Sequence, residues 1–209
     1  MSGQQKTAIV TGGSQGIGAG LVKAFLGRGY NVVANSRNIT RSGAFESSNK
    51  LALVDGNIAE PATAAKIVEA AKSTFGSIDA LVNNAGIFFS KRFTDYSIED
   101  LRSLISVNIE GFFFITQLSI KQMLAQGTGG SIVNITTTLV DHPIAASKCA
   151  VPMLTKAVFR LSPEAWRWSM QKKVYVLTPS RRVKSIRLCI RMTRRIFSRR
   201  CNRWEVFPK

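Results

Sequence analysis

Cysteine and histidine are scarce in this 209-residue chain, which contains three cysteines and one histidine. Cys149, Cys189 and Cys201 have no metal-ligand spacing and are too few for a disulfide framework. No apolar run reaches the length expected of a membrane span, and the polar residues 1–6 do not resemble a secretory signal. We therefore expect a cytoplasmic protein with no membrane partner, and the length suffices for one domain with a substantial core.

Acidic residues are also few, 12 against 29 lysines and arginines, so the formal net charge is +17. Residues 1–156 hold 14 basic and 10 acidic residues, a net charge of +4, whereas residues 157–209 hold 15 basic and 2 acidic residues, a net charge of +13. All three tryptophans lie in the second segment. This division predicts a domain over residues 1–156 and a basic tail over residues 157–209.

A glycine-rich segment, Thr11-Gly12-Gly13-Ser14-Gln15-Gly16-Ile17-Gly18, lies between a strand-like run at residues 7–10 and a helical pattern that ends near Gly27. Glycine lets the backbone bend sharply there, and it lets a pyrophosphate approach the amides at the start of the helix. The spacing is G-x-x-x-G-x-G rather than the usual G-x-G-x-x-G, and a simple tight turn is the alternative. The flanking strand and helix favour a dinucleotide site.

Strand and helix patterns alternate along the rest of residues 1–156. Short apolar runs predict strands at residues 31–35, 51–54, 79–82 and 131–135, and helical stripes occupy residues 61–75 and 98–126. The phenylalanines at 112–114 exceed a one-sided stripe, which predicts a helix buried on two faces. This alternation predicts an α/β fold with a doubly wound parallel sheet.

Three motifs resemble those of the short-chain dehydrogenase/reductase family: residues 11–18, the Asn-Asn-Ala-Gly tetrapeptide at residues 83–86, and the helix around Ser147-Lys148-Cys149-Ala150-Val151. The resemblance covers about residues 1–156 and implies a Rossmann-like dinucleotide-binding domain. It implies an NAD(P)-dependent oxidoreductase that transfers a hydride between a nicotinamide and a small-molecule carbonyl or secondary alcohol. It also implies a homodimer or homotetramer.

The same resemblance assigns the cofactor site. Arg37 follows the second strand, where an acid would favour NAD and a basic residue accommodates the 2′-phosphate of NADP, so NADP is preferred over NAD; a solvated surface arginine is the alternative. Asp55 would accept a hydrogen bond from the adenine amine, or serve only as a cap. The residues expected to bind the cofactor are Thr11, Gly12, Ser14, Gln15, Gly16, Ile17, Gly18, Arg37, Asp55, Asn83, Ala85, Gly86 and Lys148.

The expected catalytic residues are Asn108, Thr137 and Lys148, and no metal site is expected. The family places a tyrosine four residues before its lysine, where it acts as the general acid, but Ile144 stands there in this chain. No tyrosine occurs between Tyr96 and Tyr175. Two alternatives follow: His142 donates the proton, or the chain binds a nucleotide without turnover.

The basic tail does not continue the family pattern, so the C-terminal strands and helices are predicted to be lost or disrupted. Permitted codons from Ala165 to Val183, read in another frame, can encode the helix, strand and Pro-Gly turn that the family places there. We therefore predict that the sequence from about residue 157 is out of frame and poorly ordered. Nucleic acid is not an expected partner. The alternative is a functional basic tail that binds nucleic acid or anionic lipid, in which Arg194, Arg195, Arg199 and Arg200 contact phosphates and Trp204 stacks on bases.

Overall fold

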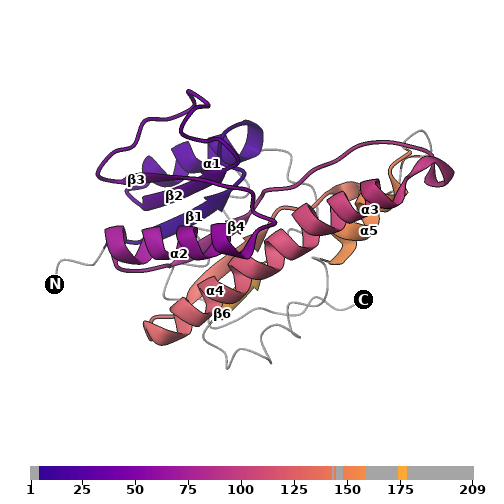
Figure 1. Cartoon of the computed structure of the whole chain (residues 1–209). Helices are drawn as coiled ribbons and strands as arrows, with labels where there is room; N and C mark the ends of the chain where they lie inside the picture. Colours follow the sequence, from indigo (N-terminus) through magenta and orange to yellow (C-terminus); the bar gives the residue numbers. More distant parts are fainter. Residues whose placement is uncertain (1–4, 143, 145–147, 159–173, 178–209) are drawn as a thin grey trace.

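A single sheet of parallel strands organises the computed structural model of the chain, which describes residues 5–142, 144, 148–158 and 174–177 (Figure 1). The described strands are β1 (Thr7–Thr11), β2 (Asn31–Ser36), β3 (Leu51–Asp55), β4 (Ala80–Asn83), β5 (Gly130–Asn134) and β6 (Val174–Leu177). Their order in the sheet is β3-β2-β1-β4-β5-β6, and every pairing is parallel. The order reverses between β1 and β4, and ligands bind such sheets at this point, beyond the carboxyl ends of the strands.

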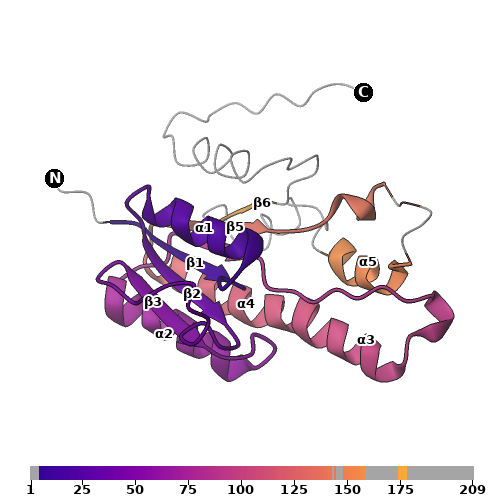
Figure 2. The same cartoon turned by 90° about the horizontal axis from the view of Figure 1, so that it is seen from above.

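Helices cover both faces of the sheet (Figure 2). The described helices are α1 (Gly16–Leu26), α2 (Pro61–Phe75), α3 (Ile98–Ile105), α4 (Gly111–Ala125) and α5 (Ala150–Ala157), with a π-helical turn η2 (Ser106–Glu110) and the 3₁₀ turns η1 (Phe93–Asp95) and η3 (Thr138–Val140). Helix α1 lies on one face, and α2 and α4 lie on the other. The fold is therefore the doubly wound α/β arrangement that the alternation of patterns predicts.

The strands are buried on both faces because each face meets a helix layer. Ala8 and Val10 of β1 pack with Val22 of α1, whereas Ile9, between them, packs with Ile67 of α2. Side chains alternate across a strand, so a two-sided core requires apolar residues at consecutive positions. This requirement explains why the sequence shows unbroken apolar runs rather than an alternating pattern.

The helix that runs through α3, η2 and α4, Ile98–Ala125, is long and apolar enough to pass a length and composition test for a membrane span, with a mean hydropathy of 1.3. The sequence analysis did not identify this helix as a candidate membrane span. The helix nevertheless contacts α2 and strands β4 and β5, as a core helix of an α/β layer does. Phe113 on α4 is 49% exposed in the single chain, so the predicted burial of the three phenylalanines on two faces is incomplete.

The predicted strands and helices of residues 7–135 match the structure to within one or two residues. The structure differs from the expectation at β6, which pairs with β5 from Gly130–Val174 to Val133–Leu177. Val-Tyr-Val-Leu is rich in strand-forming residues, and it pairs with the otherwise open edge of β5. The remaining predictions for the tail, the change of reading frame included, lie outside the described residues.

Candidate functional site

The glycine-rich turn connects β1 to α1 at the point where the strand order reverses. Gly12 and Gly16 have positive φ angles of 64° and 53°, which favour glycine, and the Gly13 amide donates to the carbonyl oxygen of Asn35 at 2.9 Å. No side chain caps the start of α1, its first turn carries no acid, and a β-carbon on Gly16 would meet no atom within 4 Å. These features suit a pyrophosphate. The first amides of the helix border open space, and the positive end of the helix dipole lies there and favours a negative charge.

A hydrogen-bonded clamp holds this turn against the end of β4. The hydroxyl of Thr11 accepts from the backbone amides of Asn84 and Ala85, both at 3.0 Å. The side-chain amide of Asn84 donates to the carbonyl oxygens of Thr11 and Gly12 at 2.9 and 3.1 Å. The buried hydroxyl of Thr11 thus aligns the glycine turn with the loop after β4, and Thr11 also lines the pocket at this edge of the sheet. Asn84 lies within the Asn-Asn-Ala-Gly motif, which the resemblance places beside the adenosine.

Arg37 directly follows β2, Asp55 is the last residue of β3, and both are exposed. The carboxylate of Asp55 accepts from the hydroxyl of Thr40 and from the Thr40 backbone amide, and these hydrogen bonds hold the pKa of Asp55 below its ordinary value. These hydrogen bonds tie the end of β3 to the loop after β2, and the N-cap of the next helix, α2, is Glu60 rather than Asp55. Asn35, absent from the predicted set, joins the ends of β2 and β3 by donating to the carbonyl oxygens of Val54 and Gly56.

Asn83, the last residue of β4, connects this strand to helix α4 and strand β5. Its side-chain amide donates to the hydroxyl of Thr116 at 2.9 Å and to Oδ1 of Asn134 at 3.0 Å. Its own Oδ1 is buried and has no hydrogen-bond partner within the described part of the chain. A buried polar atom in that state is uncommon, and it usually has a ligand or water as its partner.

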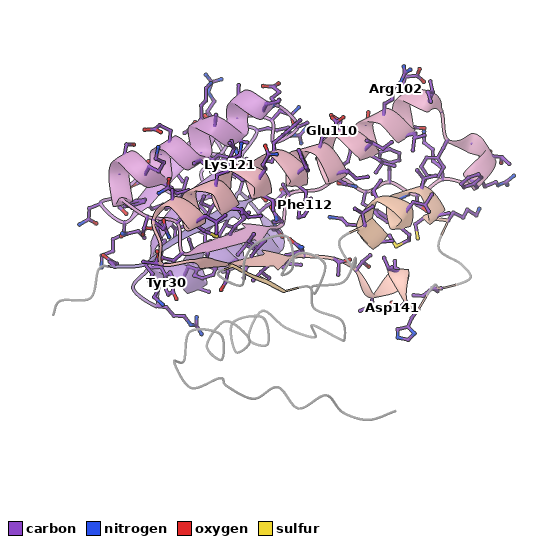
Figure 3. The ribbon with its side chains drawn as sticks, turned by 90° about the horizontal axis from the view of Figure 1, so that it is seen from below. Tyr30, Arg102, Glu110, Phe112, Lys121 and Asp141 are labelled. Atoms are coloured by element: carbon purple, nitrogen blue, oxygen red, sulfur yellow. The ribbon has the colours of Figure 1, made fainter. Side chains whose placement is uncertain are left out.

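Asn108 lies in the π-helical turn, where one extra residue widens the helix. Its Oδ1 accepts from the amide of Ile87 at 2.8 Å, and its Nδ2 donates to the carbonyl oxygen of Ile87 at 3.1 Å and to the hydroxyl of Thr155 at 3.0 Å. Asn108 thus binds both the loop after β4 and helix α5. Figure 3 shows Phe112 on the side of this helix that faces the strands, whereas Arg102 and Glu110 point away from them.

The structure does not bring Lys148 into this site. Lys148 is exposed, and the hydroxyl of Ser90 donates to its carbonyl oxygen at 2.9 Å. Lys156, eight residues further along, lines a small pocket together with Thr11, Asn83 and Ala85. Lys148 lies two residues before α5 begins, whereas Lys156 lies in the last turn of that helix, about 9 Å along its axis from Ala150.

The segment after β5 carries Thr137, whose hydroxyl accepts from the Leu139 amide at 3.3 Å. The neighbouring Thr136 hydroxyl donates to the carbonyl oxygen of Lys156 at 3.3 Å, which places this segment beside the end of α5. Ile144, at the position of the family tyrosine, is 61% exposed. The structure therefore brings Asn108, the segment around Thr137 and Lys156 to one edge of the sheet.

Burial lowers the pKa of the Lys156 amine from 10.5 to about 8. Unfolding therefore takes up a proton between these pH values, so the cost of burying the ammonium group is fully present below pH 8 and disappears as the pH rises towards 10.5.

We expect Lys156→Met to raise the free energy of unfolding by about 1–3 kcal/mol at pH 7, and by less at each step towards pH 10. Urea unfolding of both proteins at pH 7, 9 and 10 measures this difference. Lys148→Met is the control, and a difference for Lys156→Met that stays constant with pH would contradict the burial.

Comparison with known proteins adds independent findings. Residues 6–164 match the family described as short chain dehydrogenase. The chain is 34% identical over 162 residues to an NADP-dependent (R)-specific alcohol dehydrogenase of Lentilactobacillus kefiri, which covers 73% of this chain and 64% of the relative. It is 35% identical over 170 residues to a 3alpha-hydroxysteroid dehydrogenase of Mediterraneibacter gnavus, which covers 75% of this chain and 68% of the relative.

Among solved structures, a 3-ketoacyl-(acyl-carrier-protein) reductase of Brucella melitensis complexed with NADH superimposes with a TM-score of 0.75 at 28% identity, over 83% of this chain and 74% of that one. A short-chain dehydrogenase/reductase of Serratia marcescens superimposes with a TM-score of 0.71, also at 28% identity, over 84% of this chain and 77% of that one. The chain thus spans about two thirds to three quarters of the length of most of these relatives, and less than two thirds of the alcohol dehydrogenase.

Proposed function

Because this chain belongs to the short-chain dehydrogenase/reductase family, we propose that it binds NADP(H) and transfers a hydride between the nicotinamide and a small carbonyl or secondary alcohol. The observation that carries the proposal is the glycine turn at the uncapped start of α1, clamped to the end of β4 by Thr11 and Asn84. A helix start without a cap or acid has amide donors for phosphate oxygens. The NADP-dependent alcohol dehydrogenase among the relatives supports this class of cofactor and substrate.

Each part of the site has a distinct task in this proposal. The amides of residues 12–18 hold the pyrophosphate, and Arg37 binds the 2′-phosphate. The loop at residues 83–86 lies beside the adenosine, and the hydroxyl of Thr137 binds the substrate oxygen. Asn108 keeps the loop after β4 and helix α5 in fixed positions through its three hydrogen bonds. When bound, the nicotinamide supplies or accepts the hydride.

The second candidate function is nucleotide binding without turnover. It is favoured by the exposed Ile144, which cannot donate a proton to a substrate oxygen. Loss of a general acid typically slows a reaction by about 10²–10⁴-fold. Hydride transfer and binding without turnover therefore use the same cofactor site, and they differ in whether the bound cofactor exchanges a hydride with a substrate.

Calorimetric titration of the full-length chain with NADPH, followed by NADPH oxidation against a panel of ketones and aldehydes, tests the proposal. We expect saturable binding and slow oxidation with at least one carbonyl. Binding without oxidation of any carbonyl would establish the second function instead. If the folded chain releases no heat with either NADPH or NADH, both functions are wrong.

The preference for NADP depends on Arg37. We expect Arg37→Ala to weaken NADPH binding by about 10–100-fold and to leave NADH binding within a factor of about two, since a hydrogen bond between charged groups contributes about 1.5–3 kcal/mol. Titration of the variant with each cofactor measures the effect. Arg28→Ala, which removes an exposed arginine just beyond the far end of α1, is the matched control. Equal weakening for NADPH and NADH would show that Arg37 does not read the 2′-phosphate.

A further inference from the structure

A short loop, residues 55–58, follows the sheet at β3 and is held by its neighbours. The amide of Gly56 donates to the carbonyl oxygen of Ser36 at 3.1 Å, which attaches the loop to the end of β2. The side chain of Asn57 turns the chain towards α2, because its Oδ1 accepts from the amide of Ala59 at 3.2 Å. The positions of the neighbouring segments therefore set the backbone of this loop.

The loop lies between two parts of the proposed dinucleotide site. Its first residues adjoin the end of β2, which Arg37 directly follows, and its last residue, Ile58, lines the pocket that also contains Thr11 and Asn83. In NADP, the 2′-phosphate and the pyrophosphate are both attached to the ribose of the adenosine. A dinucleotide with its 2′-phosphate at Arg37 and its pyrophosphate at the start of α1 would therefore place its adenine beside residues 55–58.

Helix α4 reaches this loop through a glycine. A β-carbon on Gly111, the first residue of α4, would lie 2.8 Å from Cγ2 of Ile58 and 3.2 Å from the backbone carbonyl carbon and oxygen of Ile58. Ile58 is 5% exposed and packs in the core with Ala64 and Ile67 of α2, so it cannot move away without disturbing that packing. The lack of a side chain at position 111 thus allows the close approach of α4 to the loop.

The same stretch of helix also holds the second loop of the site. Asn108, three residues before Gly111, is bonded to the amide and the carbonyl oxygen of Ile87 in the loop after β4. About one turn of helix therefore sets the positions of both loops. The loop after β4 is held by hydrogen bonds, and the loop after β3 is held by packing.

We propose that Gly111 is a positioning residue for the adenosine half of bound NADP(H), and that it acts through Ile58 on the loop after β3. This inference rests on the proposed function and deepens it, because it adds a residue outside the binding motifs that determines affinity for one half of the cofactor. Gly111 has no side chain that could bind a ligand, so its effect is on the position of the loop.

Gly111→Ala, titrated with NADPH and with adenosine 2′,5′-bisphosphate, tests the inference. We expect both dissociation constants to rise by the same factor, about 10-fold, because the displaced loop contacts the half that both ligands contain. Gly27→Ala, a glycine with a helical φ of −63°, is the matched control and should leave both constants within about twofold. Circular dichroism confirms that the variants are folded. Unchanged binding of the bisphosphate overturns the inference, whether or not NADPH binding weakens.

A second background shows whether Gly111 acts through Ile58. Ile58→Ala removes Cγ2, the atom closest to the added methyl group. In that background we expect Gly111→Ala to raise the dissociation constant for NADPH by less than about threefold, because neighbours that share a contact are not additive. An undiminished effect would show that Gly111 acts through another contact, and it would overturn the inference.

Hydrogen exchange on the unsubstituted full-length chain gives a measurement that no folding defect can affect. We expect saturating adenosine 2′,5′-bisphosphate to slow exchange at least about threefold in peptides that cover residues 55–59 and 107–112, and to leave residues 23–30 unchanged. If NADPH binds but the bisphosphate protects neither peptide, this inference fails and the proposed function stands. If wild type binds neither NADPH nor NADH, the proposed function fails and the inference with it.

Discussion

Gly18→Ala is expected to abolish dinucleotide binding and to destabilise the fold. A β-carbon at position 18 would lie 2.0 Å from the carbonyl oxygen of Gly12 and 2.6 Å from Nδ2 of Asn84. Both neighbours belong to the clamp between the glycine turn and β4, because Nδ2 of Asn84 donates to the Gly12 carbonyl oxygen. The turn must therefore move, and the hydrogen bonds that align it with the loop after β4 must stretch or break.

We expect the free energy of unfolding to fall by about 2–3 kcal/mol, the cost of forcing an extra carbon into a packed site. The dissociation constant for NADPH should rise at least about 100-fold, because the amides at the start of α1 lose their alignment. Urea unfolding and calorimetric titration measure the two effects, with titration restricted to variant protein that is folded by circular dichroism.

Gly27→Ala at the other end of α1 is the matched control. Gly27 has a φ of −63°. A β-carbon added there would lie 3.3 Å from the carbonyl oxygen of Lys23, the nearest atom. Alanine adopts that conformation, so we expect stability within about 1 kcal/mol of wild type and unchanged binding. Unchanged NADPH affinity in Gly18→Ala would mean that the phosphates bind elsewhere.

Asn108→Leu is expected to produce the second large effect, a loss of about 2–5 kcal/mol in the free energy of unfolding. Asn108 is 1% exposed, and leucine of similar size would leave the amide and carbonyl of Ile87 and the hydroxyl of Thr155 without their partner. Each buried polar group left unsatisfied costs about 1–3 kcal/mol. The loop after β4 and helix α5 would both lose their attachment to the π-helical turn, so NADPH binding should weaken as well.

Urea unfolding measures the stability of Asn108→Leu, and Gln117→Leu on the exposed side of α4 is its control, with an expected change within about 0.5 kcal/mol. Wild-type stability of Asn108→Leu would show that the three hydrogen bonds contribute little, and that backbone packing alone holds the loop.

Local patterns in the sequence were sufficient for the sheet. Each strand of residues 7–135 is an apolar run, and the predicted helix at residues 61–75 coincides with α2, which begins at a proline and ends before Gly76 in a left-handed conformation. These signals lie within a few residues of the element they define, so one sequence contains them in full. The parallel order followed from the alternation of strands and helices, which permits few topologies.

The hydrogen-bond partners of the polar side chains around the candidate site could not be predicted from the sequence. Asp55 was expected to face the adenine, and the structure gives its carboxylate two hydrogen bonds from Thr40, fifteen residues earlier in the chain. Asn35 donates to backbone carbonyls at the end of β3, and nothing in its local sequence distinguishes such a side chain from one that points to solvent. These roles depend on which strand ends lie next to one another.

The sequence by itself determined where the chain forms strands and helices, and that a glycine turn opens the first helix, because backbone propensity and hydrophobic period act over short distances. Tertiary structure alone decided that β6 pairs with β5 and that Lys156, at the end of α5, lines a pocket beside Thr11 and Asn83. A motif specifies the spacing of residues along a helix, but it does not specify which turn of that helix lies beside the ends of the strands. Contacts with distant segments set that position, here Thr136 after β5 and Asn108 in the π-helical turn.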